Sequence, residues 1–156
     1  SDTVIGMDVM TTRGEIVEKA VKFEDFGYRT SPVGREECVI AGRFRLHTAD
    51  GEDLEREMEY VYRERKERHP MEYPSAGSVF KAAGGRSAWW FVEKAGLRGY
   101  RMGDACVSEK HTNFIVNMGH ARAADIAALI RKIKEEVLSK LGVRLEEEVE
   151  LWGFNG

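Results

Sequence analysis

PSAGSVFK, residues 74–81, places one hydroxyl, that of Ser78, between a permissive glycine and two apolar residues. Gly77 can adopt backbone angles that other residues avoid, and it lets a ligand approach the main chain closely. Val79 and Phe80 would anchor the following strand in a core, which would fix the direction of the Ser78 side chain. The pattern is therefore typical of a segment that positions one side chain, here Ser78, in a site. An ordinary glycine turn that opens a buried strand is the simpler interpretation of these residues alone.

The chain before this stretch predicts two strands and one long polar helix. Val4–Met10 alternates well enough for a strand, and residues 37–46 predict a strand with one buried and one solvated face. Residues 50–68 combine a thin apolar stripe with oppositely charged pairs at i, i+4 spacing, which is typical of a solvated helix. That helix must end before Pro70.

The chain after this stretch predicts two helices and three strands. Residues 88–97 form a short helix that is apolar nearly all round, as expected of a helix packed on both sides. Residues 121–141 repeat apolar side chains with a period of 3.6, and Gly142 ends that helix. The three strands are predicted at residues 102–108, 114–117 and 146–154.

Composition and charge limit the classes of function. The 156 residues, 42% apolar and 33% charged, suffice for one compact domain or two small ones. The net charge of -3 arises from interspersed charges of both signs, which argues against a nucleic-acid partner. No apolar run reaches membrane-spanning length and no signal peptide is present, so no membrane partner is expected and a cytoplasmic location is predicted. Cys38 and Cys106 lie far apart in apolar, strand-like surroundings, which favours buried reduced thiols and offers no metal-ligand spacing.

Three further polar stretches are candidates for a site. Arg29, within FGYRTS, can present its planar fork to a carboxylate or phosphate, although a surface salt bridge is the common alternative. Lys110 and His111, within SEKHTN, could bind an anion, although a polar hairpin turn would have the same composition. In the predicted strand at residues 146–154, alternation places Glu148 and its second neighbours on one face, and one of these carboxylates could point into a site.

Taken together, these stretches resemble a known enzyme family. FGYRTS, PSAGSVFK, EKAGLRGYRMGDACVSEKHTNFIVN and EEEVELWGF, in this order and at these separations, resemble the C-terminal half of UDP-N-acetylenolpyruvoylglucosamine reductase, a flavoenzyme of peptidoglycan precursor synthesis. The resemblance covers nearly the whole chain. Four ordered motifs are far more specific than any single short pattern.

The resemblance implies a mechanism and assigns residues to it. In this family, FAD reduced by NADPH passes hydride to C3 of the enolpyruvyl group of UDP-N-acetylglucosamine enolpyruvate, and a serine protonates C2. Ser78 matches that serine. Arg29 matches the arginine that supports the serine and the developing negative charge, and Glu148 matches the glutamate near the same carbon.

The resemblance also implies contacts with the substrate. His111 falls where the family contacts the nucleotide sugar, and Tyr28 is expected to bind substrate beside Arg29. Lys81 and Lys110 are expected partners of the diphosphate on charge grounds. One departure is that Ala82 and Ala83 replace the family's Asn-Pro, which removes one side-chain contact to the substrate.

The implied architecture is α+β with two domains. Residues 1–68 are expected to be the C-terminal part of an FAD-binding domain. Residues 69–156 are expected to be a substrate-binding domain whose antiparallel or mixed sheet packs on the long C-terminal helix. The family's glycine-rich FAD segments are not in this sequence, so flavin binding is expected to need an N-terminal flavin-binding fragment as partner.

Two hypotheses of different class remain. The chain is either the C-terminal portion of a working reductase or a non-catalytic nucleotide-sugar-binding or interaction module. The first hypothesis predicts exposed apolar surface near Val4–Met10 and around Trp89 and Trp90.

Overall fold

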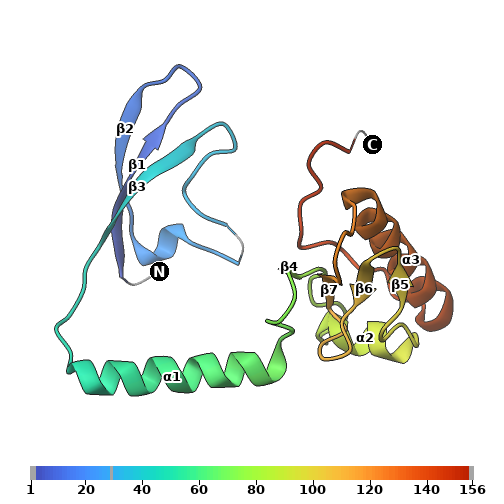
Figure 1. Ribbon diagram of the computed structural model, residues 1–156. Helices are drawn as coiled ribbons and strands as arrows, with labels where there is room; N and C mark the ends of the chain where they lie inside the picture. The colour runs from blue at the N-terminus through green and yellow to red at the C-terminus, as the bar shows by residue number, and fades with distance from the viewer. Residues whose placement is uncertain (1–2, 29, 155–156) are drawn as a thin grey trace. The chain divides into compact units, whose positions relative to one another are not determined.

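The structure is a computed structural model that describes residues 3–28 and 30–154 (Figure 1). It has two compact units, Ser1–Leu54 and Glu55–Gly156, which are described separately below. Both helices and antiparallel sheets are present, so the predicted α+β class is confirmed. None of the helices in the described ranges is long and apolar enough to cross a membrane.

The first unit is built on a three-stranded antiparallel sheet. Its strands are β1 (Val4–Met10), β2 (Ile16–Ala20) and β3 (Cys38–Phe44), in the order β2-β1-β3. The predicted strand at the start of the chain is therefore confirmed. A short 3-10 turn, η1 (Phe23–Asp25), follows β2. Met7, Val9 and Val21 form the small buried cluster of this unit.

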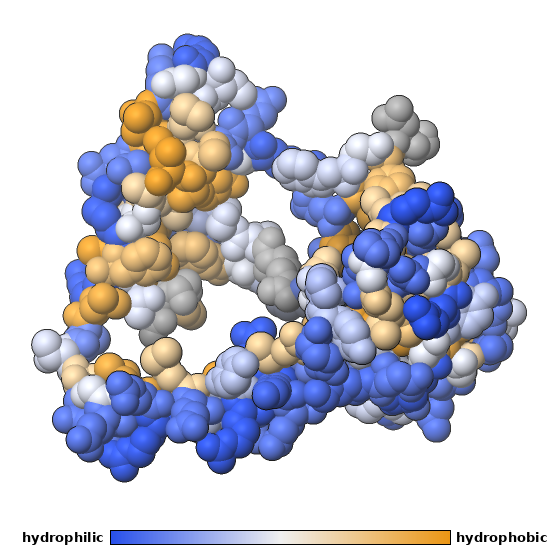
Figure 2. Space-filling view, viewed as in Figure 1, coloured by the Kyte–Doolittle hydropathy of each residue, from blue (hydrophilic) through white to orange (hydrophobic). Residues whose placement is uncertain are grey.

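Apolar side chains of this sheet are exposed, and Figure 2 shows hydrophobic surface over it. The prediction that one face of residues 37–46 is buried is wrong, because Val39 and Ile40 are each 50% exposed and Phe44 is 59% exposed. Cys38 is also exposed, contrary to the expected buried thiol. Exposed apolar surface beside β1 is what the reductase hypothesis predicts.

Helix α1 (Gly51–Arg68) confirms the predicted long polar helix, and the boundary between the two units lies within it. The Asp50 side chain begins the helix by accepting from the backbone N–H groups of Glu52 and Asp53, at 3.0 and 3.2 Å. None of the residues of α1 is buried, and the side chains of its thin apolar stripe are exposed: Leu54 by 46%, Met58 by 71% and Val61 by 49%.

The second unit packs a four-stranded antiparallel sheet against two helices. Helix α3 (Ala123–Leu141) begins two residues later than predicted and ends at Gly142, whose φ of 69° is left-handed. Ile130, Ile133 and Val137 of α3 are fully buried in the core, as the 3.6-residue period predicts. The sheet order is β4-β7-β6-β5. The remaining elements are β4 (Ser75–Ser78), α2 (Ala88–Lys94), β5 (Arg101–Met102), β6 (Ala105–Val107) and β7 (Phe114–Asn117).

One predicted strand of this unit is shorter than expected, because only β6 lies on its continuous part and pairs with β7, and another predicted strand is wrong. Residues 102–108 contain a tight turn at Gly103, whose φ is 58°, and this turn separates β5 from β6. Residues 146–154 do not form a strand; within the described residues they contribute one isolated bridge, between Phe80 and Glu147. The alternation of apolar and acidic residues in that segment therefore does not place them on opposite faces of a strand.

Candidate functional site

Ser78 is the last residue of β4 and follows a β-bulge. Ser75 pairs with Val116 and Ser78 pairs with Phe114, so three steps along β4 oppose two steps along β7. Gly77 lies within this bulge at a φ of 85°, a conformation that glycine adopts without strain. Bulges commonly re-aim a side chain beside an active site. The bulge thus alters the backbone geometry immediately before Ser78, whose side chain is half-buried.

The chain after Ser78 is held against the segment that contains Glu148. The backbone N–H of Glu148 donates to the carbonyl of Val79 at 2.8 Å, and the N–H of Lys81 donates to the carbonyl of Glu146 at 2.9 Å. These bonds join segments almost 70 residues apart in sequence, and they place Glu148 beside the residue that follows Ser78. Two of the predicted site residues are therefore brought together.

The glutamates around Glu148 are engaged in ion pairs. Glu146 Oε1 lies 3.0 Å from Lys81 Nζ, and Glu147 Oε1 lies 2.6 Å from Lys134 Nζ on α3. Burial raises the pKa of Glu147, but the hydrogen bond from Lys134, a backbone hydrogen bond and the charge of Lys134 together outweigh burial, and the pKa lies below its ordinary value. These pairs tie the segment to the chain that follows β4 on one side and to α3 on the other.

His111 lies in a cluster of aromatic rings. Its ring centroid is 4.9 Å from that of Phe114, 5.5 Å from that of His69 and 6.5 Å from that of Trp89. Burial lowers the pKa of His111, and the nearby His69 lowers it further. His111 is therefore a neutral ring at pH 7, which suits stacking or hydrogen bonding to a sugar or base better than pairing with a phosphate.

Lys110 is tied to the end of helix α1. Its Nζ donates to the backbone carbonyl of Lys66 at 2.7 Å and lies 3.8 Å from Glu72 Oε2. A cation near a helix C-terminus is stabilised by the helix dipole. Lys110 would have to leave these partners in order to bind a diphosphate, and the same holds for Lys81 and its partner Glu146.

Two of the predicted site residues belong to the first unit. Tyr28 is 72% exposed, beside the isolated bridge between Gly27 and Thr30. Arg29 lies outside the described residues. The predicted set is thus divided between Ser1–Leu54 and Glu55–Gly156.

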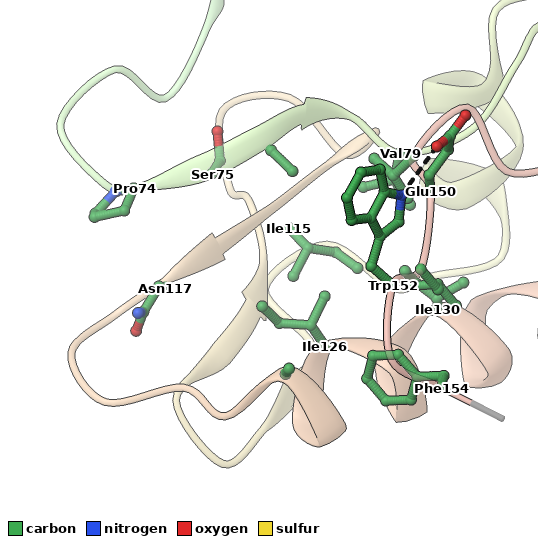
Figure 3. A pocket seen from close by; sticks show the side chains of 14 residues that line it. Pro74, Ser75, Val79, Ile115, Asn117, Ile126, Ile130, Glu150, Trp152 and Phe154 are labelled. Atoms are coloured by element: carbon green, nitrogen blue, oxygen red, sulfur yellow. Dashed lines mark hydrogen bonds between the residues drawn. The ribbon is translucent and has the colours of Figure 1, made fainter. Parts of the chain in front are cut away.

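A groove of about 510 Å³ lies beside the candidate site in the second unit (Figure 3). Val79 and Ile115 line it, together with Ile126 and Ile130 of α3. Four consecutive residues, 149–152, also line it, which no strand alternation would allow. Ser78 is not among the lining residues, so the groove and the candidate proton donor are separate features.

Asn113 is a candidate that inspection of the sequence missed. It is only 7% exposed, and its side-chain amide bonds both backbone groups of Phe80. The only signal in the sequence is an amide side chain directly before the apolar strand at residues 114–117. That signal does not distinguish an asparagine in an ordinary turn from one that pairs with a distant strand.

Comparisons with known proteins agree with one another. The family described as UDP-N-acetylenolpyruvoylglucosamine reductase, C-terminal domain, matches residues 69–152. A UDP-N-acetylenolpyruvoylglucosamine reductase of Syntrophobacter fumaroxidans is 46% identical over 125 residues, covering 80% of this chain and 36% of that protein. One from Agathobacter rectalis is 42% identical over 153 residues, covering 97% of this chain and 49% of that protein.

A solved structure shows that the fold of this chain is also similar. The crystal structure of the UDP-N-acetylenolpyruvylglucosamine reductase (MurB) of Thermus caldophilus matches with a TM-score of 0.75 and 36% identity, over 96% of this chain and 54% of that chain. The chain spans about half, or less, of the length of the two reductases above.

Proposed function

This chain belongs to the UDP-N-acetylenolpyruvoylglucosamine reductase family, and we propose that it is the C-terminal portion of a working reductase. The reaction would reduce the enolpyruvyl ether of UDP-N-acetylglucosamine enolpyruvate to UDP-N-acetylmuramate with NADPH and FAD, in the cytoplasm, for peptidoglycan synthesis. The proposed domains are residues 1–68, on the flavin side, and residues 69–156, on the substrate side. The non-catalytic alternative is not favoured, because the relatives described above are all named as reductases.

One observation carries the proposal, which is the hydrogen bond from Glu148 N–H to the Val79 carbonyl at 2.8 Å. This bond supports the proposal because it holds the proposed proton donor, Ser78, near the proposed glutamate although the two lie far apart in sequence.

The residues of this chain would supply the proton side of the reaction. Hydride addition at C3 of the enolpyruvyl group leaves negative charge that is drawn toward the substrate carboxylate, and Arg29 would stabilise that charge. Ser78 would then give its hydroxyl proton to C2. A serine hydroxyl is a weak acid, so it must be held close to the carbon and must recover its proton from a neighbouring group. Glu148 is the residue that we propose for assistance at this carbon.

The described residues of the first unit do not by themselves fit the pyrophosphate of FAD. A pyrophosphate is held by converging backbone N–H groups at glycine-rich turns or helix N-termini. In this unit the exposed sheet residues Val39 and Ile40 are apolar, and the N–H of Gly14 already donates to the Thr11 carbonyl at 2.9 Å. We therefore assign FAD and NADPH to the complete reductase, including an N-terminal flavin-binding part, and derive no step through them.

The substrate side would use four residues, His111, Tyr28, Lys81 and Lys110. The neutral His111 ring would contact the nucleotide sugar, and Tyr28 would contact the substrate from the first unit. Lys81 and Lys110 would exchange their present partners for the diphosphate, which would make substrate affinity depend on salt concentration.

The experiment that tests the proposal is a turnover assay of the complete reductase that carries this chain. Oxidation of NADPH should depend on addition of UDP-N-acetylglucosamine enolpyruvate, and the product should be UDP-N-acetylmuramate. Binding of the sugar nucleotide without any oxidation of NADPH would contradict the proposal and would support a non-catalytic binding module.

A further inference from the structure

We propose that Asn113 is a positioning residue for the proton donor, because its side chain holds the backbone that follows Ser78. This inference rests on the proposed function, and it assigns a role in catalysis to a residue that contacts neither the substrate nor the cofactor.

Asn113 makes three hydrogen bonds to the two residues that follow Ser78. Its Oδ1 accepts from the Phe80 N–H at 3.0 Å, and its Nδ2 donates to the Phe80 carbonyl at 2.9 Å. Its backbone carbonyl accepts from the Val79 N–H at 2.8 Å. A primary amide carries one acceptor and two donors, so it can pair with a peptide group as a neighbouring strand would. Asn113 therefore extends the pairing to the two residues that follow β4, beyond the Ser78 and Phe114 pair at which the ladder between β4 and β7 stops.

This side-chain pairing lies where the backbone ladder is irregular. The register of β4 on β7 shifts between Ser75 and Ser78, and Gly77 has a left-handed φ of 85°. Glycine has few conformational restrictions, so the bulge alone leaves the direction of Ser78 weakly determined. Fixed bonds on the C-terminal side of Ser78 are needed to determine it.

The opposite edge of the same segment is held by the Glu148 region. Glu148 N–H donates to the Val79 carbonyl at 2.8 Å, and Lys81 N–H donates to the Glu146 carbonyl at 2.9 Å. Residues 79–81 are thus bonded on both edges, by Asn113 and by residues 146–148. Removal of the Asn113 side-chain amide would leave residues 79–81 held by the Glu148 edge and by the single bond from the Val79 N–H to the Asn113 carbonyl, and would deprive both backbone groups of Phe80 of their Asn113 partners.

Burial makes the Asn113 amide hard to replace. The Phe80 side chain is 2% exposed, and the hydrogen bonds between Asn113 and Phe80 are themselves buried. Water therefore does not take over when the amide is removed, and the backbone must move to find new partners. A misplacement of about 1 Å in a reacting group can lower a rate by about 100-fold.

The test compares three variants in the complete reductase: Asn113→Leu, Asn113→Asp and Asn117→Ala. Leucine has a similar size and removes both side-chain hydrogen bonds to Phe80, whereas aspartate keeps an acceptor and loses the donor. Asn117 is the matched control, because its Oδ1 accepts from the Gly119 and Ala121 N–H groups at 2.9 Å and its side chain makes no bond to residues 78–81 in the described part of the chain.

The expected result separates chemistry from binding. In Asn113→Leu, the rate of transfer to the enolpyruvyl group should fall by about 100-fold, while the substrate KM changes less than about threefold and flavin reduction by NADPH is unchanged. The solvent deuterium isotope effect on transfer should rise, because proton delivery becomes limiting. Asn113→Asp should show a loss of the same kind, because its second carboxylate oxygen faces the Phe80 carbonyl and cannot donate to it, and Asn117→Ala should transfer at the normal rate. Amide hydrogen exchange at residues 79–80 should accelerate in the Asn113 variants only.

Three results would overturn the inference. Normal transfer in Asn113→Leu, with faster exchange at Phe80, would show that the amide holds the strand without directing Ser78. A parallel loss of flavin reduction and transfer in Asn113→Leu would show general damage to the fold. Asn113→Asp, which keeps the shape and one bond, would then have to lose transfer while flavin reduction stays normal, and a parallel loss there too would overturn the inference. Absence of sugar-dependent NADPH oxidation in the unsubstituted reductase would instead refute the proposed function, and this inference with it.

Discussion

Substitution of Gly77 by alanine tests whether the bulge in β4 directs Ser78. The φ of Gly77 is 85°, and a Cβ added there would meet no heavy atom within 4 Å. The substitution therefore introduces backbone strain without a steric clash. A left-handed backbone costs a non-glycine residue about 1–2 kcal/mol, and the reduced freedom of the unfolded chain offsets about 0.4–1 kcal/mol of that cost.

The net loss of stability should be about 1 kcal/mol, which lowers the Tm of a domain of about 100 residues by about 4–8 °C. The strain is relieved most easily by rotation of residue 77 toward negative φ, and this rotation moves Ser78. We therefore expect transfer to the enolpyruvyl group to fall by about 100-fold, on the same reasoning about misplacement of a reacting group.

Gly96→Ala is the matched control for this experiment. Gly96 has a φ of 78°, and a Cβ added there would also meet nothing within 4 Å. It follows α2 rather than β4, so its substitution should cost a similar amount of stability without changing transfer. The assays are thermal unfolding and single-turnover transfer from the reduced enzyme. Normal transfer in Gly77→Ala, with the expected loss of Tm, would refute the reasoning.

Three further predictions concern pH and packing. Burial and the neighbouring His69 lower the pKa of His111, so the folded state binds fewer protons than the unfolded state near this pKa. The contribution of His111 to the free energy of unfolding should therefore be fully present above about pH 6.5 and decrease as the pH falls below it. His111→Phe should flatten this pH dependence in denaturant titrations. Hydrogen bonds from Lys132 and Lys140 lower the pKa of Glu136 to about 2. The difference in unfolding free energy between the native chain and Glu136→Gln should therefore be present above about pH 5 and shrink as the pH falls toward 2. A difference that grows on acidification would contradict this ion-pair account. Ile133 is fully buried, so Ile133→Ala should cost about 2–5 kcal/mol and Ile133→Val about 0.5–1.5 kcal/mol in the free energy of unfolding; equal costs would show that the site collapses around the cavity.

The elements that the sequence predicted well are those with strong local signals. The 3.6-residue period of residues 121–141 and the left-handed Gly142 that follows specify α3 without any knowledge of its partners. Residues 50–68 are helical because of charge spacing and an aspartate cap, and the structure places them as expected.

The errors arise where tertiary contacts override local pattern. Residues 146–154 alternate as a strand would, yet four consecutive residues, 149–152, line one groove. Among the described residues of this segment only Glu147 forms a bridge, with Phe80 beyond the end of β4. Gly103 splits the predicted strand at residues 102–108 because its positive φ permits a tight turn.

The resemblance of motifs assigns Ser78 and Glu148 to one site, and this assignment stays a prediction. The backbone bonds between Val79 and the Glu148 segment show how those two motifs come to lie together. Asn113 was not predictable, because a side chain that pairs with a distant backbone leaves no periodic signal. The lowered pKa of His111 also depends on its burial and on the approach of His69, which lies 42 residues earlier in the chain.

The central claim is that Ser78 delivers the proton in a reductase of this family. Its most direct test is Ser78→Ala in the complete reductase, with the two half-reactions measured separately in single turnover. Reduction of the flavin by NADPH should proceed at the normal rate, while transfer to the enolpyruvyl sugar should fall by orders of magnitude. Near-normal transfer in Ser78→Ala would contradict the claim and remove Ser78 from the chemistry.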